Sequence, residues 1–196
     1  LVYKFLRQIG HKNLVFYIPD RYNDGYGISI RGIDFAARKG VTLTIALDCG
    51  IKAVEKVVYA KEKGVDFIIC DHHLPADEIP AAVAVLDPKR ADCNYPFDEL
   101  SGCGVGFKLV QAYAMKHGIP FSEIEHLLDL LVVSIASDIV PLTGENRILA
   151  YYGLERLNRM PSSGLHSIIK ICGLDKHNIT IDDIVFKIGP RINAAG

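Results

Sequence analysis

Hydrophobic and polar positions follow two different periods along the first half of the chain. Four short apolar runs are typical of buried strands, at residues 14–18, 41–47, 65–70 and 82–86. Between them, apolar residues recur at helical spacing over 28–39 and 51–63, and each segment ends at a glycine. Strands that alternate with helices predict an α/β fold, a parallel β-sheet with helices on both faces. The nearly continuous apolar strands agree with burial of both faces.

The pattern changes after residue 87. A polar loop runs to Ser101, and apolar residues then recur at helical spacing over 105–117, 122–135, 147–158 and 165–172. We expect these helices to form a helical C-terminal segment of the same core rather than a separate domain. A helix is also expected at the very start, where Leu1, Phe5 and Ile9 are four residues apart.

Composition excludes several classes of protein. The chain has 196 residues, of which 49% are hydrophobic and 23% charged, so a single folded core is expected and disorder is excluded. The richest apolar run, 127–136, contains Asp129 and is shorter than the roughly 18 residues of a membrane span. A net charge of −1 means that any nucleic-acid binding must come from a local patch.

The cysteines indicate a compartment. There are five, an odd number, and no two are spaced as Cys-x-x-Cys. This pattern argues against a disulfide scaffold and against a structural zinc knuckle. We therefore expect a reducing, cytoplasmic environment.

Polar side chains follow three of the predicted strands directly, and Pro19, Asp20 and Arg21 follow the first of them, the run 14–18. Asp48 follows the run 41–47, and Asp71, His72 and His73 follow the run 65–70. Taken alone, Asp48 is more often a turn or capping residue, and a lone histidine is more often structural. Their coincidence at the carboxyl ends of neighbouring strands favours a site. Carboxylates and imidazoles without a thiolate cluster favour Mn²⁺ or Mg²⁺, the ions of hydrolytic phosphate chemistry.

Three further segments are weaker candidates. Asp138 ends an apolar helix and is a further candidate ligand, although such a residue taken alone is more often simply a helix-end residue. The glycine-rich segment 101–106 resembles an anion-binding turn, with helix capping as the alternative. The Gly/Pro/Asn-rich stretch 189–196 is expected to be a loop in which Arg191 suits a phosphate contact.

Six segments in order carry a resemblance to a known family. They are PDRYNDGYG (19–27), LDCG (47–50), DHH (71–73), SGCGVGFK (101–108), ASDIVPL (136–142) and GPRINAAG (189–196). Together they resemble the RecJ branch of the DHH phosphoesterase superfamily, the bacterial single-stranded-DNA-specific exonucleases. The resemblance implies 5′→3′ hydrolysis of single-stranded DNA to mononucleotides in DNA repair and recombination, with Mn²⁺ or Mg²⁺.

The resemblance also implies roles for individual residues. Asp48 would bridge two metal ions, and His72 and Asp138 would complete the shell of the second ion. His73 would contact the scissile phosphate or assist the leaving group, and Asp71 would support the histidines from behind.

The resemblance further implies a nucleic-acid contact surface. Arg21, His73, Arg191 and Asn193 would hold the DNA backbone or its 5′ phosphate. Single-stranded DNA is the expected partner, with no membrane involved, and helicase or single-strand-binding proteins are expected partners at the level of the family. Residues 1–141 would be a DHH-type α/β phosphoesterase domain, and 142–196 the helical C-terminal part of the same catalytic core.

One departure from the family is large. The first family motif, Asp-x-Asp-x-Asp-Gly after the first strand, does not occur in the sequence. We therefore expect the domain to be truncated at its N-terminus and the chain to be inactive alone. Two ions are expected in the complete protein, and at most one, weakly bound, in this chain.

Two alternatives stay open. The first is a DHH phosphoesterase that acts on short oligonucleotides, cyclic dinucleotides or pyrophosphate; the segments 19–27 and 189–196 favour the exonuclease branch over it. The second is a non-catalytic nucleic-acid-binding scaffold. The presence of Asp48, His72, His73 and Asp138 argues against a scaffold.

Overall fold

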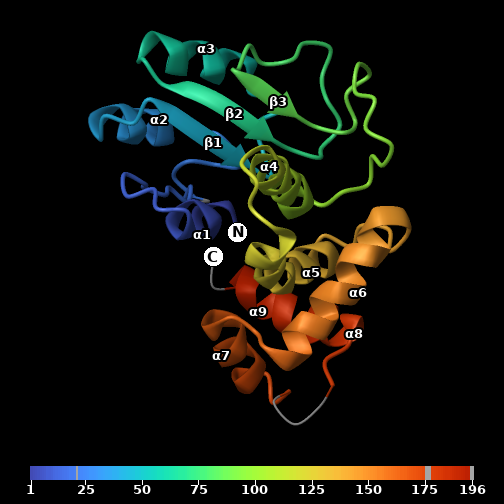
Figure 1. Cartoon of the computed structure of the whole chain (residues 1–196). Helices are drawn as coiled ribbons and strands as arrows, with labels where there is room; N and C mark the ends of the chain where they lie inside the picture. The colour runs from blue at the N-terminus through green and yellow to red at the C-terminus, as the bar shows by residue number, and fades with distance from the viewer. Residues whose placement is uncertain (21, 175–177, 195–196) are drawn as a thin grey trace. The chain divides into compact units, whose positions relative to one another are not determined.

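The computed structural model describes residues 1–20, 22–174 and 178–194. It divides into two compact units, each described by itself (Figure 1). The first, Val2–Asp98, is called here the sheet unit, and the second, Glu99–Gly196, the helical unit. The predicted domains 1–141 and 142–196 follow a different division, and they stay a prediction.

The sheet unit contains a parallel three-stranded sheet. Its strands are β1 (Leu43–Leu47), β2 (Asp66–Cys70) and β3 (Ala84–Leu86), in the order β1-β2-β3. Its helices are α1 (Val2–Gln8), α2 (Ile30–Arg38) and α3 (Val54–Glu62). Helix α3 connects β1 to β2, which pair in parallel from Leu43↔Asp66 to Leu47↔Cys70. The predicted α/β class is confirmed.

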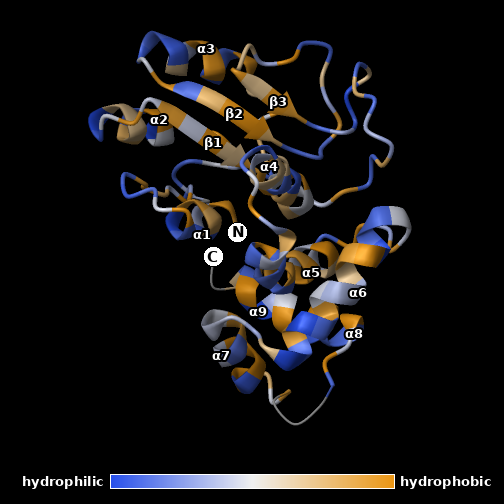
Figure 2. Ribbon diagram, viewed as in Figure 1, coloured by the Kyte–Doolittle hydropathy of each residue, from blue (hydrophilic) through white to orange (hydrophobic). Residues whose placement is uncertain are grey.

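The core of this unit joins helices α2 and α3 to the sheet. Ile33 of α2 and Val57 of α3 are buried in one cluster with Ala46, Phe67 and Ile69 of the strands. Phe67 and Ile69 are two residues apart and therefore face the same side of β2. Figure 2 shows the strands as mostly hydrophobic and the helices as mixed. This core makes the sheet a rigid base for the residues that follow its strands.

The first predicted strand is wrong. Residues 14–18 form no strand, and Phe16 and Ile18 are 69% and 77% exposed. The aromatic rings of this run instead contact helices. Phe16 lies edge-on to Tyr3 of α1, and the ring centroids of Tyr17 and Phe35 of α2 are 5.3 Å apart. A short apolar run predicts burial, but strand pairing also needs a partner backbone, which local pattern does not specify.

The helical unit holds the remaining elements. They are α4 (Gly102–Lys116), the 3₁₀ turns η1 (Phe121–Glu123) and η2 (Glu125–Leu127), α5 (Leu128–Ser137), α6 (Gly144–Arg159), α7 (Ser163–Ile171), α8 (Ile181–Asp183), the π-helical turn η3 (Ile184–Ile188) and α9 (Gly189–Ala194). The four predicted helices are present, although the one expected at 122–135 begins with two 3₁₀ turns. Among the described residues, no helix is both long and apolar enough to cross a membrane.

The structure shows what the two glycine-rich segments of the sequence form, and the described part of each belongs to a helix. The segment 101–106 is the start of α4: Ser101 caps the helix by accepting the N–H of Gly104 at 3.1 Å, and most of the following turn is buried. The capping interpretation therefore holds. The stretch 189–194 is helix α9 rather than a loop. A Cβ atom at Gly189 would lie 2.8 Å from Oγ of Ser137 and 3.2 Å from the carbonyl oxygen of Ile184, so a side chain there would require its neighbours to shift.

Helices α5 and α6 approach closely at Gly153, which leads to a stability prediction. An added Cβ would lie 2.6 Å from the carbonyl oxygen of Leu128 and 2.7 Å from Cβ of Val132. We expect Gly153→Ala to lower the free energy of unfolding by about 1–3 kcal/mol, measured by urea denaturation. Gly164→Ala in α7 is the matched control, because nothing lies within 4 Å of its added methyl group. A Gly153→Ala protein as stable as the control would contradict this packing.

Candidate metal centre

The strand register brings two acids to the same edge of the sheet. Leu47 and Cys70 are the last paired residues of β1 and β2, so Asp48 and Asp71 follow at the same level. The N–H of Asp48 donates to the carbonyl of Cys70 at 2.8 Å, and the N–H of Asp71 donates to the carbonyl of Leu86 at 3.0 Å. The parallel pairing therefore continues one residue past each strand and fixes both acids at the carboxyl edge.

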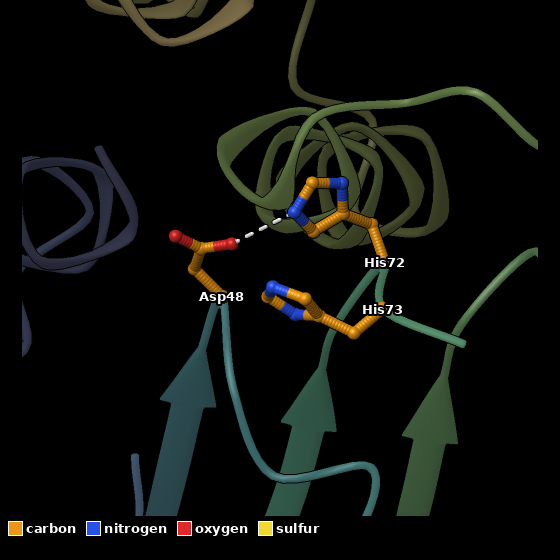
Figure 3. Close-up of side chains that lie close together, drawn as sticks. All are labelled: Asp48, His72 and His73. Carbon is orange, nitrogen blue, oxygen red and sulfur yellow. Dashed lines mark ion pairs between the residues drawn. The ribbon is translucent and has the colours of Figure 1, made fainter. Parts of the chain in front are cut away.

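Three side chains converge above this edge. A carboxylate oxygen of Asp48, a ring nitrogen of His72 and a ring nitrogen of His73 lie within 4.8 Å of one another. Nε2 of His72 is 3.1 Å from Oδ1 of Asp48, and the two imidazole rings are 4.7 Å apart between centroids (Figure 3). Among the described residues, this is the group of acids, cysteines and histidines with metal-binding spacing.

Asp71 lies beneath the histidines and holds one of them. It is 1% exposed, and its Oδ1 lies 2.6 Å from Nδ1 of His73. Burial pushes the pKa of Asp71 upward, but hydrogen bonds from Ile51 N–H, the His73 ring and His72 N–H outweigh burial and leave that pKa below its ordinary value. The ionised carboxylate therefore accepts the Nδ1 proton of His73. In the tautomer that donates from Nδ1, Nε2 is the nitrogen of His73 that can act as a metal ligand.

The three residues fit a divalent cation. Oδ1 of Asp48 is buried and receives no well-formed hydrogen bond from the described residues, even though a histidine nitrogen lies 3.1 Å away. A cation between the oxygen and the nitrogen would satisfy both. The nearby thiols do not compete, because burial raises the pKa of Cys49 to about 11 and of Cys70 to about 12. Carboxylate and imidazole donors without a thiolate are compatible with Mn²⁺ or Mg²⁺.

A cavity of about 650 Å³ opens beside the cluster, within the sheet unit. Its walls include His73 and Tyr26 on the side of the cluster, Lys52 just before α3, and Lys56 in the first turn of α3. Glu78 also lines it, so the cavity carries charges of both signs. Its size and position are compatible with a polar substrate next to the metal ligands.

The other predicted site residues lie in the helical unit or outside the described residues. Asp138 is the exposed C-cap of α5, and its Oδ2 accepts a hydrogen bond from Ser134 at 3.3 Å. Arg191 and Asn193 are exposed on α9, where the guanidinium of Arg191 donates to the carbonyl of Lys187 at 2.8 Å. Arg21 lies outside the described residues. The roles predicted for these four residues stay predictions.

Two residues at this edge were missed as site residues from the sequence. Asp87 follows β3 as Asp48 follows β1, and it is 3% exposed. Burial raises the pKa of Asp87, although the N–H of Lys89 donates to Oδ1. Its position directly after an apolar run was a usable signal. Tyr26 donates its hydroxyl to the carbonyl of Asp48 at 3.0 Å, a contact that no local pattern indicates.

Comparison with known proteins identifies relatives that match most of the chain. Residues 1–135 match the DHH family, N-terminal domain. The chain is 43% identical over 181 residues to the single-stranded-DNA-specific exonuclease RecJ of Bacillus subtilis (strain 168), an alignment that covers 92% of this chain and 22% of the relative. Across curated relatives of this name, the chain spans 22–35% of their length.

Solved structures agree with the sequence matches. Exonuclease RecJ bound to manganese superposes with a TM-score of 0.79 and 29% identity, over 91% of this chain and 44% of that one. RecJ of Thermus thermophilus in complex with Mg²⁺ gives a TM-score of 0.58 and 28% identity, over 79% of this chain and 20% of that one. The Asp-His-His triplet that follows β2 thus lies within a sequence match that covers most of the chain, and the chain belongs to the DHH family.

Proposed function

We propose that this chain forms part of the catalytic centre of a metal-dependent exonuclease that hydrolyses single-stranded DNA in the 5′→3′ direction to mononucleotides. The observation that carries the proposal is the convergence of Asp48, His72 and His73 at the end of the parallel sheet. Support also comes from relatives named single-stranded-DNA-specific exonuclease and from RecJ structures with Mn²⁺ or Mg²⁺.

In the proposed site, Asp48, His72 and His73 would hold a divalent cation. The resemblance implies a phosphate contact for His73, and we propose it as a ligand instead because its ring lies within ligand spacing of Asp48 and His72. When bound, such ions act as Lewis acids on the phosphate and lower the pKa of the attacking water. In the tautomer in which Nδ1–H of His73 donates to Asp71, the lone pair of the ring lies on Nε2, which would be the nitrogen offered to the cation. The cavity beside His73 would receive the strand next to the reacting phosphodiester.

The proposal includes partners and a cellular setting. Single-stranded DNA is the proposed substrate, and a role in DNA repair and recombination follows from the resemblance to RecJ. Asp138 is proposed to complete the shell of the second ion, and Arg21, Arg191 and Asn193 to contact DNA. A cytoplasmic location is proposed because the sequence has an odd number of cysteines and no Cys-x-x-Cys pair, a pattern that argues against a disulfide scaffold.

The test uses the natural polypeptide that carries this chain. It is incubated with Mn²⁺ and a single strand labelled at its 3′ end, and the products are separated by length. We expect progressive shortening of the labelled strand together with release of unlabelled mononucleotides. The matching duplex and an EDTA-treated sample should stay intact.

Other outcomes would decide against the proposal. Immediate loss of the 3′ label would reverse the proposed direction of hydrolysis. Turnover of a cyclic dinucleotide or a dinucleotide without turnover of the long strand would favour a small-substrate phosphoesterase. Binding of the strand with no hydrolysis in Mn²⁺ or Mg²⁺ would favour a scaffold.

A further inference from the structure

The backbone of Asp48 has a conformation that most residues avoid. Its φ is +63°, in the left-handed region, where a side chain other than hydrogen meets the following carbonyl. Aspartate enters this region more readily than most residues, but surrounding contacts must hold it there. The conformation follows β1 immediately, at the point where the Asp48 carboxylate lies next to His72.

Two hydrogen bonds hold the backbone of Asp48 in this conformation. Its N–H donates to the carbonyl of Cys70 in β2, and its carbonyl accepts the hydroxyl of Tyr26 at 3.0 Å. The ring of Tyr26 also meets the ring of His73 edge to face, with centroids 6.1 Å apart at 79°. Tyr26 therefore touches two of the three residues of the cluster, one through its hydroxyl and the other through its ring.

The loop that carries Tyr26 has hydrogen bonds of its own. The hydroxyl of Tyr17 donates to Asp24 Oδ2 at 2.6 Å, and the same oxygen accepts the N–H of Asp20 at 3.0 Å. Oδ1 of Asp20 accepts the N–H of Asn23 at 2.8 Å. These contacts tie Tyr17, Asp20, Asn23 and Asp24 together shortly before Tyr26 in the chain.

We propose that Tyr26 is a positioning residue of the metal centre: its hydroxyl holds Asp48 in the left-handed conformation, and its ring limits the rotation of His73. This inference deepens the proposed function and rests on its metal site. Without the hydroxyl, the peptide group after Asp48 rotates more freely, and the carboxylate spends less time in the ligating position. Groups that orient metal ligands in this way change metal affinity 10–100-fold when they are removed.

The test is a Mn²⁺ titration of the natural polypeptide by calorimetry. Tyr26→Phe removes the hydroxyl and keeps the ring, and we expect it to raise the Kd for Mn²⁺ about tenfold. Tyr26→Ala removes the ring contact as well and should raise the Kd further. Tyr22→Phe is the matched control, because Tyr22 lies in the same loop and is 98% exposed; its Kd should equal that of the parent.

Hydrogen exchange of the Asp48 amide in the metal-free natural polypeptide gives a readout that does not depend on metal binding. The exchange rate should rise about fivefold in Tyr26→Phe and stay unchanged in Tyr22→Phe. Parent-like exchange in Tyr26→Phe, or a parent-like Kd, would overturn the positioning role. If Asp48→Asn loses Mn²⁺ while Tyr26→Phe does not, only this inference fails. If Asp48→Asn binds Mn²⁺ as the parent does, both the proposed metal site and the positioning role of Tyr26 fail.

Discussion

Replacement of Asp48 by alanine is expected to abolish Mn²⁺ binding at the cluster and to lower nuclease activity of the natural polypeptide at least about 10³-fold. Asp48 is the carboxylate of the cluster, and the two imidazoles that remain carry no negative charge to balance a divalent cation. A metal ion contributes several kcal/mol to stabilisation of the transition state, and about 4 kcal/mol corresponds to 10³ in rate. Calorimetric Mn²⁺ titration and single-strand hydrolysis measure the two losses.

The left-handed backbone at Asp48 makes a second variant necessary. Alanine is less tolerant of a φ of +63° than aspartate or asparagine, so Asp48→Ala also perturbs the turn after β1. Asp48→Asn keeps the backbone preference and removes the charge, and it should lose Mn²⁺ with little change in thermal stability. Asp77→Ala, an exposed acid outside the cluster, is the control and should behave as the parent. Residual hydrolysis within tenfold of the parent would remove Asp48 from its proposed role.

Asp71→Asn is expected to destabilise the fold and the metal centre together. Its carboxylate accepts hydrogen bonds on both oxygens, from the N–H of Ile51 at 2.9 Å on Oδ2 and from His72 and His73 on Oδ1. An amide in its place turns one of these acceptors into a donor, so a buried donor is left without a partner in either orientation. We expect the free energy of unfolding to fall by about 2–3 kcal/mol and the Kd for Mn²⁺ to rise about 10–100-fold.

The pH dependence of stability separates this charge effect from simple loss of packing. Because the folded-state pKa of Asp71 is lowered, its contribution is present above the ordinary aspartate pKa of 3.8 and is lost as the pH falls through the folded-state value. Urea denaturation at several pH values should therefore show the largest gap between parent and Asp71→Asn near neutral pH, narrowing in acid. The exposed Asp66, also in β2, provides the control variant Asp66→Asn. A gap that stays constant with pH would show that Asp71 acts through shape and not through charge.

Most residues at the carboxyl edge of the sheet could be predicted from the sequence, because the apolar runs and the polar residues after them are local patterns. The runs 41–47 and 65–70 predicted β1 and β2 within two residues, and the polar residues after them mark where burial ends. Parallel pairing then places residues that follow neighbouring strands at one edge. The same rule wrongly predicted a strand at 14–18. Aromatic side chains of this run pack against α1 and α2, and its backbone pairs with no strand among the described residues.

The sequence by itself determined the α/β class, the resemblance to the DHH family and the identities of Asp48, His72 and His73, because periodicity and residue type are written along the chain. Only the tertiary structure decided how these groups meet: the 3.1 Å approach of His72 to Asp48, the buried Asp71 that orients His73, and the Tyr26 hydroxyl on the Asp48 carbonyl. These contacts join residues up to 24 positions apart through strand register and a left-handed turn. Their geometry depends on packing between segments, which no local pattern specifies.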